Sequence, residues 1–153
     1  MIDLYSWPTP NGRKISIALE EFELDYTAHP INIGKDEQFT PKFLKISPNN
    51  KIPAIVDRTT GRALMESGAI LIYLAERYDK FWGDDRYETL EWLMFQMGGL
   101  GPMLGQAHHF LHYNPGKAPY ADGRYREEAR RLYSVLNTRL QDKEYLSGKY
   151  SIA

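Results

Sequence analysis

The chain has 153 residues, and its 19 lysine and arginine residues against 20 aspartate and glutamate residues give a formal net charge of −1. Hydrophobic residues make up 42% of the sequence and cysteine is absent, which fits a globular protein without disulfides, thiolate metal sites or a cysteine nucleophile. The balanced charge argues against nucleic acid as a partner. No signal-peptide pattern and no stretch of about 18 apolar residues is present, so we expect a cytoplasmic protein without a membrane partner.

The first third of the chain is predicted to form a strand, a helix and a second strand. The strands are expected at residues 2–5 and at Tyr26 to Ile33. Between them, apolar residues recur with the i, i+3, i+4, i+7 spacing of a helix face: Ile15, Ala18, Leu19 and Phe22. Thr9 is predicted to cap this helix, with Pro10 at its first position. A β-α-β unit of this kind requires a parallel pair of strands.

The next segments predict a short helix, a hairpin and a longer helix. Thr40 and Pro41 repeat the pattern of a capping residue followed by proline. Residues 54–56 and 63–65 are apolar runs on either side of a polar turn, which favours a β-hairpin. Ser67 is predicted to cap the helix that follows. The order β-α-β, short helix, β-β, α describes an α/β domain over residues 1–82.

Strand signals stop after about residue 82, so residues 83–153 are predicted to form an all-α domain. Residues 87–112 are apolar with helical spacing, and a further helix is expected from Pro119. Pro102 lies within the first of these segments. Because proline lacks a backbone N–H and clashes with the preceding turn, we expect it to kink or split that helix.

Two short motifs are candidates for a binding site. The first motif is Asn49-Asn50-Lys51-Ile52-Pro53-Ala54. In one interpretation Pro53 only begins a strand. In the other, the Ile52–Pro53 bond is cis and turns the main-chain N–H and C=O of Ile52 outward, where they can pair with an extended peptide. The second motif is Glu66-Ser67-Gly68. In one interpretation Ser67 only caps a helix. In the other, its hydroxyl and the free N–H groups of the helix N-terminus bind an anion. Glu66 beside it would suit an ammonium group, so this pair would match the two charges of an amino acid.

Four motifs, taken in their order along the chain, resemble the glutathione transferases, most closely their bacterial Nu class. They are Leu4-Tyr5-Ser6-Trp7-Pro8-Thr9-Pro10-Asn11-Gly12, Ser47-Pro48-Asn49-Asn50-Lys51-Ile52-Pro53, Glu66-Ser67-Gly68-Ala69-Ile70 and Gly98-Gly99-Leu100-Gly101-Pro102-Met103. The resemblance covers the whole chain. It implies an α/β thioredoxin-like N-terminal domain followed by an all-α C-terminal domain. In the family the helical domain continues for several more helices, so the resemblance also implies that this one is shortened.

The resemblance assigns roles to particular residues, with glutathione as the co-substrate. Thr9 and Asn11 are the implied catalytic pair, which would donate hydrogen bonds to the glutathione sulfur. A free thiol has a pKa of about 8.5, so the thiolate must be stabilised to predominate at neutral pH. The implied glutathione-binding residues are Asn11, Gln38, Lys51, Ile52, Pro53, Glu66, Ser67 and Arg124.

The implied function is an enzyme that reduces disulfides, and in addition organic hydroperoxides, by thiol–disulfide exchange through bound glutathione. Its partners would be a small-molecule disulfide or electrophile and a second copy of the chain, since the family forms homodimers. The alternatives are a non-catalytic binding or regulatory module and weak conjugation of glutathione to electrophiles. A glutaredoxin-like protein is disfavoured because cysteine is absent.

Other candidate residues carry less weight. Ser6 is a weak alternative to Thr9, and Tyr5 is expected in the core. Trp7 and Met103 fit an electrophile pocket, the core or a dimer contact equally well. A metal site is not expected, because the closely spaced histidines lack a third ligand: His108, His109 and His112.

Overall fold

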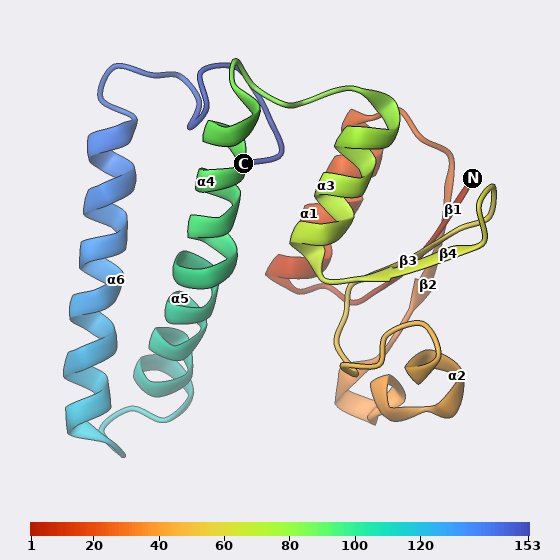
Figure 1. Cartoon of the computed structure of the whole chain (residues 1–153). Coiled ribbons are helices and arrows are strands. Elements are labelled where there is room, and N and C mark those ends of the chain that lie inside the picture. The colour runs from red at the N-terminus through yellow and green to blue at the C-terminus, as the bar shows by residue number, and fades with distance from the viewer. The chain divides into compact units, whose positions relative to one another are not determined.

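Four strands form the sheet of the first of two units into which the chain divides, Met1–Lys80 and Phe81–Ala153. The computed structural model describes all residues, 1–153 (Figure 1). The strand order is β2-β1-β3-β4, with β1 parallel to β2 and antiparallel to β3, and β3 antiparallel to β4. The strands are β1 (Ile2–Ser6), β2 (Tyr26–Pro30), β3 (Ala54–Asp57) and β4 (Arg62–Met65).

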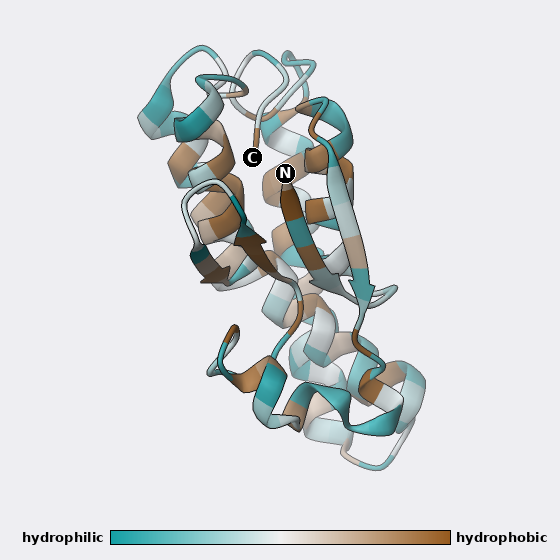
Figure 2. Cartoon of the chain, turned by 90° about the vertical axis from the view of Figure 1, so that its right-hand side faces the viewer, coloured by the Kyte–Doolittle hydropathy of each residue, from teal (hydrophilic) through white to brown (hydrophobic).

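Two helices, α1 (Pro10–Glu21) and α3 (Ser67–Tyr78), lie side by side against the same face of this sheet (Figure 1). Successive residues of a strand point to opposite faces, so the apolar residues of β1 alternate with its polar ones. The alternation is visible in Figure 2 as brown and teal bands along β1 beside a paler edge strand, β2. The core between sheet and helices is fully buried and includes Ile2, Ile15, Leu19, Ile55, Ile70 and Leu74.

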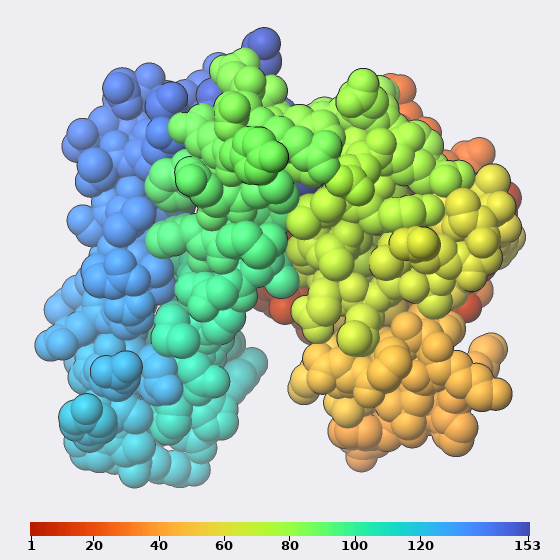
Figure 3. All heavy atoms as spheres, viewed as in Figure 1, coloured from red at the N-terminus to blue at the C-terminus, as the bar shows by residue number.

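A segment of short helices connects β2 to β3. It contains two 3₁₀ turns, Ile33–Lys35 and Glu37–Phe39, and the helix α2 (Pro41–Leu44). This segment is orange in Figure 3 and projects below the sheet in that view. The β-α-β, short helix, β-β, α order is the thioredoxin-like arrangement, which confirms the predicted fold class.

The second unit is helical. Its first helical segment runs without a break through α4 (Arg86–Phe95), a π-helical turn at Gln96–Leu100, α5 (Gly101–His108) and a second π-helical turn at His109–Tyr113. The helix α6 (Pro119–Arg139) returns alongside α5 (Figure 1). None of these helices, nor any in the first unit, combines the length and hydropathy that a membrane span requires.

One local prediction was wrong, and one of the two effects expected of Pro102 does not occur. The second strand ends at Pro30, because Asn32 caps a 3₁₀ turn by accepting a hydrogen bond from the amide of Gly34, 3.0 Å away. Pro102 does not split its helix. The preceding π-helical turn is wider than an α-helical one, and the amide of Gly101 donates to the carbonyl of Gln96. The proline ring therefore follows a widened turn rather than a regular one.

Candidate functional site

The N-terminus of α1, shortly after the end of β1, carries Thr9 and Asn11. Thr9 caps the helix as predicted, since its hydroxyl oxygen accepts from the amide of Gly12 at 3.1 Å. A hydroxyl that accepts one bond still has its own proton to donate. The side chain of Asn11 is exposed and has no hydrogen-bond partner in the protein. Two side chains able to donate hydrogen bonds thus lie within the first residues of α1, and the helix N-terminus favours negative charge beside them.

Gly12 is required by the way the chain turns from β1 into α1. A Cβ at this position would lie 2.4 Å from the carbonyl oxygen of Trp7 and 2.5 Å from the hydroxyl oxygen of Ser6. The amide of Thr9 also donates to the carbonyl of Trp7 at 2.7 Å. The tight turn therefore fixes where the Thr9 hydroxyl points.

A second segment of the site is the loop that leads into β3. The Ile52–Pro53 peptide bond is cis, and Pro53 is buried. Neither main-chain group of Ile52 is hydrogen-bonded within the protein, so its N–H and C=O are free to pair with an extended ligand. Lys51, directly before it, is exposed.

The third segment is the junction of β4 and α3. Glu66 is exposed, has a positive φ of 70°, and its carboxylate accepts from the side-chain amide of Asn49 at 3.2 Å. Ser67 was predicted as the helix cap, and that prediction was wrong: Glu66 occupies the cap position, and Ser67 is the first helical residue, 3% exposed. Glu66 makes no capping hydrogen bond, so the first amides of α3 are not satisfied by it.

The strand register brings these three segments to one end of the sheet. Tyr5 of β1 pairs with Ala54 of β3, and Ala54 pairs with Met65 of β4. Thr9 follows the first of these strands, Pro53 precedes the second and Glu66 follows the third. Residues far apart in the sequence therefore lie along one edge, at the N-termini of two helices.

Gln38 lies in the segment between β2 and β3. It is half-buried, and its side-chain oxygen is inaccessible to solvent without a hydrogen-bond partner. An unsatisfied buried oxygen is costly. No hydrogen bond connects Gln38 to Thr9, Ile52 or Glu66, so the structure does not join it to them directly.

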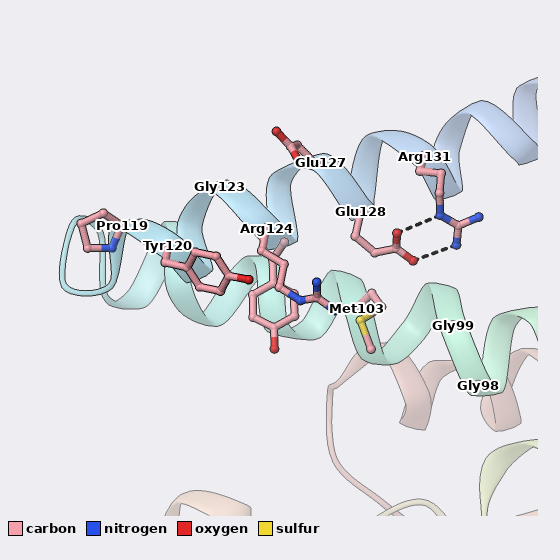
Figure 4. Close-up of a pocket in the computed structure, with 11 residues that line it drawn as sticks. Gly98, Gly99, Met103, Pro119, Tyr120, Gly123, Arg124, Glu127, Glu128 and Arg131 are labelled. Carbon is pink, nitrogen blue, oxygen red and sulfur yellow. Dashed lines mark hydrogen bonds and ion pairs between the residues drawn. The ribbon is translucent and has the colours of Figure 1, made fainter.

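Arg124 belongs to the second unit. It points from α6 toward Met103 of α5 in a cleft of about 1020 Å³ between the two helices (Figure 4). Gly98 and Gly99 lie on the opposite wall, and Glu128 and Arg131 form a bidentate pair at 2.7 and 2.8 Å. Arg131 lowers the pKa of the Glu128 carboxyl through this pair, and Arg124 adds a smaller effect in the same direction.

The other hydroxyl candidates are placed less favourably. Tyr5 is half-buried rather than in the core, on the sheet face opposite α1 and α3, and its ring stacks on His29 with 4.7 Å between centroids. Burial and the neighbouring Asp3 raise the pKa of the Tyr5 phenol. The hydroxyl of Ser6 makes only a long contact of 3.5 Å to the carbonyl of Trp7.

The histidines of the second unit form ring contacts. His108 and His112 stack in parallel at 4.7 Å, and His109 packs edge-on against Phe110. No group of three or more potential metal ligands gathers in the structure.

Two residues near the site were not identified from the sequence. Ser47 is fully buried and its hydroxyl donates to the carbonyl of Lys51 at 2.8 Å. Asn49 contacts Glu66 as described above. Both belong to the Ser47-Pro48-Asn49-Asn50 run, whose composition indicates a turn but not which side chains it anchors.

Comparison with known proteins assigns the chain to a family. The family model "Glutathione S-transferase, N-terminal domain" matches residues 1–76. Disulfide-bond oxidoreductase YfcG of Escherichia coli (strain K12) is 56% identical over 162 residues, covering 100% of this chain and 75% of YfcG. The chain belongs to the glutathione S-transferase family, which confirms the resemblance seen in the sequence.

Two further matches agree with this assignment. Disulfide-bond oxidoreductase YghU of the same organism is 42% identical over 165 residues, but this chain spans only 57% of its length. A crystal structure of a glutathione transferase from Pseudomonas putida, with one glutathione disulfide bound per subunit, superposes with a TM-score of 0.91 at 46% identity. That match covers 99% of this chain and 70% of the other.

Proposed function

We propose that this protein binds glutathione at the edge formed by the three segments of the first unit and uses its thiol to reduce small disulfides. The observation that carries the proposal is the placement of Thr9 and Asn11, at the N-terminus of α1, at the same end of the sheet as Pro53 and Glu66. The names of YfcG and YghU, and the glutathione disulfide in the Pseudomonas putida structure, support the same chemistry.

The site residues receive the following roles in this proposal. Thr9 and Asn11 donate hydrogen bonds to the glutathione sulfur and stabilise its thiolate. The free N–H and C=O of Ile52, beside Pro53, pair with the cysteinyl unit. Glu66 and Ser67 bind the γ-glutamyl end. Gln38, Lys51 and Arg124 complete the set of glutathione-binding residues. The positively charged side chains of Lys51 and Arg124 suit the carboxylates of glutathione.

The reaction proceeds by two exchanges of sulfur. The glutathione thiolate attacks one sulfur of the substrate disulfide, forms a mixed disulfide and releases the other sulfur as a thiolate, which takes up a proton. A second glutathione thiolate then attacks the glutathione sulfur of the mixed disulfide. This step forms glutathione disulfide and releases the second substrate thiol. Two glutathione molecules are oxidised and one disulfide is reduced, and the protein, which has no cysteine, changes no covalent bond.

Stabilising the thiolate is the main catalytic task. Converting most of a thiol with a pKa of about 8.5 into thiolate at neutral pH requires a drop of about two units, or about 2.7 kcal/mol. A hydrogen bond to a charged group contributes about 1.5–3 kcal/mol, and a helix N-terminus adds about 0.3–1 kcal/mol. Thr9, Asn11 and the end of α1 together match the requirement.

The test is glutathione-dependent reduction of 2-hydroxyethyl disulfide, followed through NADPH consumption by added glutathione reductase. The double variant Thr9→Ala/Asn11→Ala should lower kcat/KM at least about 10- to 100-fold, because it removes both donors to the sulfur. The matched control is Thr138→Ala/Asn137→Ala, which removes the same two side chains from exposed positions of α6. Its activity should equal that of the wild type.

Either of two results would contradict the proposal. Equal losses in the two double variants would show that the donors at α1 are not specific to the reaction. A folded wild-type chain that binds glutathione without turnover would favour the non-catalytic module.

We propose further that the protein acts as a homodimer in the cytoplasm. Large apolar or aromatic side chains of the second unit are exposed: Tyr87, Met94, Tyr113, Tyr120, Tyr133 and Leu140. Such a surface suits a protein interface. The chemistry also needs the reduced glutathione that the cytoplasm maintains. Light scattering that gives the mass of a single chain would contradict the dimer. Recovery of the protein outside the cytoplasmic fraction of the cell would contradict the location.

A further inference from the structure

We infer that Asn49 is a positioning residue for glutathione, acting through Glu66. The side-chain amide nitrogen of Asn49 donates to Oε1 of Glu66 at 3.2 Å, and this bond joins the loop before β3 to the junction of β4 and α3. The inference deepens the proposed function and rests on it, because Glu66 is the proposed partner of the glutathione α-ammonium group.

Glu66 needs an external partner to be held in place. It is exposed, and although it occupies the cap position of α3 it makes no capping hydrogen bond that would fix its side chain. Ordering a free glutamate side chain costs rotamer entropy. The bond from Asn49 orders Oε1 before the ligand arrives, while Oε2 has no partner in the protein. Such preorganisation improves affinity without adding a contact to the ligand.

Asn49 itself is held by a closed turn. The hydroxyl of buried Ser47 donates to the carbonyl of Lys51 at 2.8 Å, and the amide of Asn50 donates to the carbonyl of Ser47 at 2.9 Å. Pro48 restricts the backbone directly before Asn49. The donor to Glu66 therefore comes from a rigid element that also carries Ile52, the proposed partner of the cysteinyl unit.

The chemistry of the amide suits this role. A lysine or arginine at position 49 would pair with the Glu66 carboxylate and compete with the ammonium group of the ligand. The amide of asparagine is neutral, so it orients the carboxylate and leaves its negative charge for the ligand. If the contact between Asn49 and Glu66 only held two loops together, its loss would weaken the binding of ligands with and without the ammonium group equally.

The dependence on the ligand's ammonium group gives the test. Binding of glutathione, and of the analogue in which hydrogen replaces the α-amino group, is measured by calorimetry for the wild type, Asn49→Ala and the control Asn137→Ala, an exposed asparagine of α6. We expect Asn49→Ala to weaken glutathione binding about fivefold and analogue binding less than about twofold, since a net hydrogen bond of this kind contributes about 1 kcal/mol. In turnover, KM for glutathione should rise and kcat at saturation should hold, because Thr9 and Asn11 are untouched.

The outcomes separate the inference from the proposed function. Equal weakening of both ligands, or no weakening of glutathione binding, would overturn the inference, because Asn49 would then act through the loop or not at all. A wild type that binds both ligands equally would also overturn it, by removing the ammonium partner of Glu66, while glutathione binding would stand. A wild type that binds no glutathione would overturn the proposed function and the inference with it.

Discussion

Gly12 shows how a single residue fixes the geometry of the proposed thiolate site. Its amide donates to the hydroxyl oxygen of Thr9, and its missing side chain lets α1 begin directly beside the end of β1. Any Cβ there would meet a main-chain oxygen, that of Trp7, at 2.4 Å. Because a main-chain atom cannot rotate away, the helix start would have to move.

Gly12→Ala is therefore expected to lower the free energy of unfolding by about 1–3 kcal/mol, the range for an overpacked site, and to reduce activity by displacing Thr9. The control is Gly105→Ala, which lies in the exposed part of α5 where a Cβ would meet nothing within 4 Å. That change should raise stability by up to about 1 kcal/mol, since alanine favours a helix over glycine. Urea unfolding measures both changes in the free energy of unfolding. If the two changes have the same sign, the close approach of the Trp7 carbonyl does not explain the need for glycine at position 12.

At the residue scale, local patterns were readable and longer contacts were not. The Thr9 cap follows from a threonine before proline at the start of an apolar period, and the structure confirms it. The bond between Asn49 and Glu66 depends on the register of β3 and β4, which places their segments together. No spacing in the sequence specifies that contact. The cap of α3 was misplaced by one residue because Glu66 takes up a positive φ that its residue type does not favour.

At the scale of elements, the turn from Ser47 to Lys51 connects the short helix α2 to β3. The fully buried hydroxyl of Ser47 donates to the carbonyl of Lys51, which in a helix or strand would accept from a main-chain amide. The side chain of Ser47 therefore has a structural function in this loop. The turn thereby supports two of the three segments of the candidate site.

Ser47→Ala should lower the free energy of unfolding by about 1–3 kcal/mol, because the hydrogen bond from the buried hydroxyl of Ser47 to the carbonyl of Lys51 would be lost. Ser134→Ala, an exposed serine of α6, is the control and should change stability by less than about 0.5 kcal/mol. Chemical denaturation of both variants measures the difference. A loss as small as that of the control would show that water replaces the hydroxyl.

Most elements were predictable because each has its own period and cap. The structure confirms the first helix, the hairpin and the helix from Pro119. The split expected at Pro102 does not occur, because the clash of a proline ring with the preceding turn assumes a regular α-helix there. The π-helical turn at Gln96–Leu100 is a property of the folded backbone, and no spacing of residues in the sequence predicts it.

At the scale of the whole molecule, the two units differ in how their carboxylates are placed. In the first unit, Asp3 accepts bonds from Arg58 at 2.5 and 2.8 Å and contacts His29 at 2.7 Å, and these partners hold its pKa below the usual value. Burial would raise the pKa of Asp57, but bonds from Tyr73 and the amide of Thr59, with the charge of Arg77, lower it overall. In the second unit, Glu128 has a lowered pKa, but its partner Arg131 is exposed to solvent. Surface pairs of this kind contribute little to stability.

The sign of the pH effect follows from these shifts. A carboxyl whose pKa is lower in the folded than in the unfolded state stabilises the fold when both are ionised. That stabilisation is complete above the unfolded pKa of about 4 and is lost as the pH falls toward the lower folded pKa. Acid should therefore weaken the first unit, which holds both Asp3 and Asp57.

Asp57→Asn tests this at the better buried of the two sites, where the side chain is 1% exposed. The amide can still accept from Tyr73, but it cannot pair with the charge of Arg77. We expect the variant to be less stable than the wild type at pH 7 and to lose less stability between about pH 5 and pH 2.5, so that the two curves converge in acid. Asp142→Asn, at an exposed position after α6, should follow the wild type throughout. Urea unfolding at a series of pH values measures the curves, and an Asp57→Asn curve parallel to that of the wild type would place the acid sensitivity elsewhere.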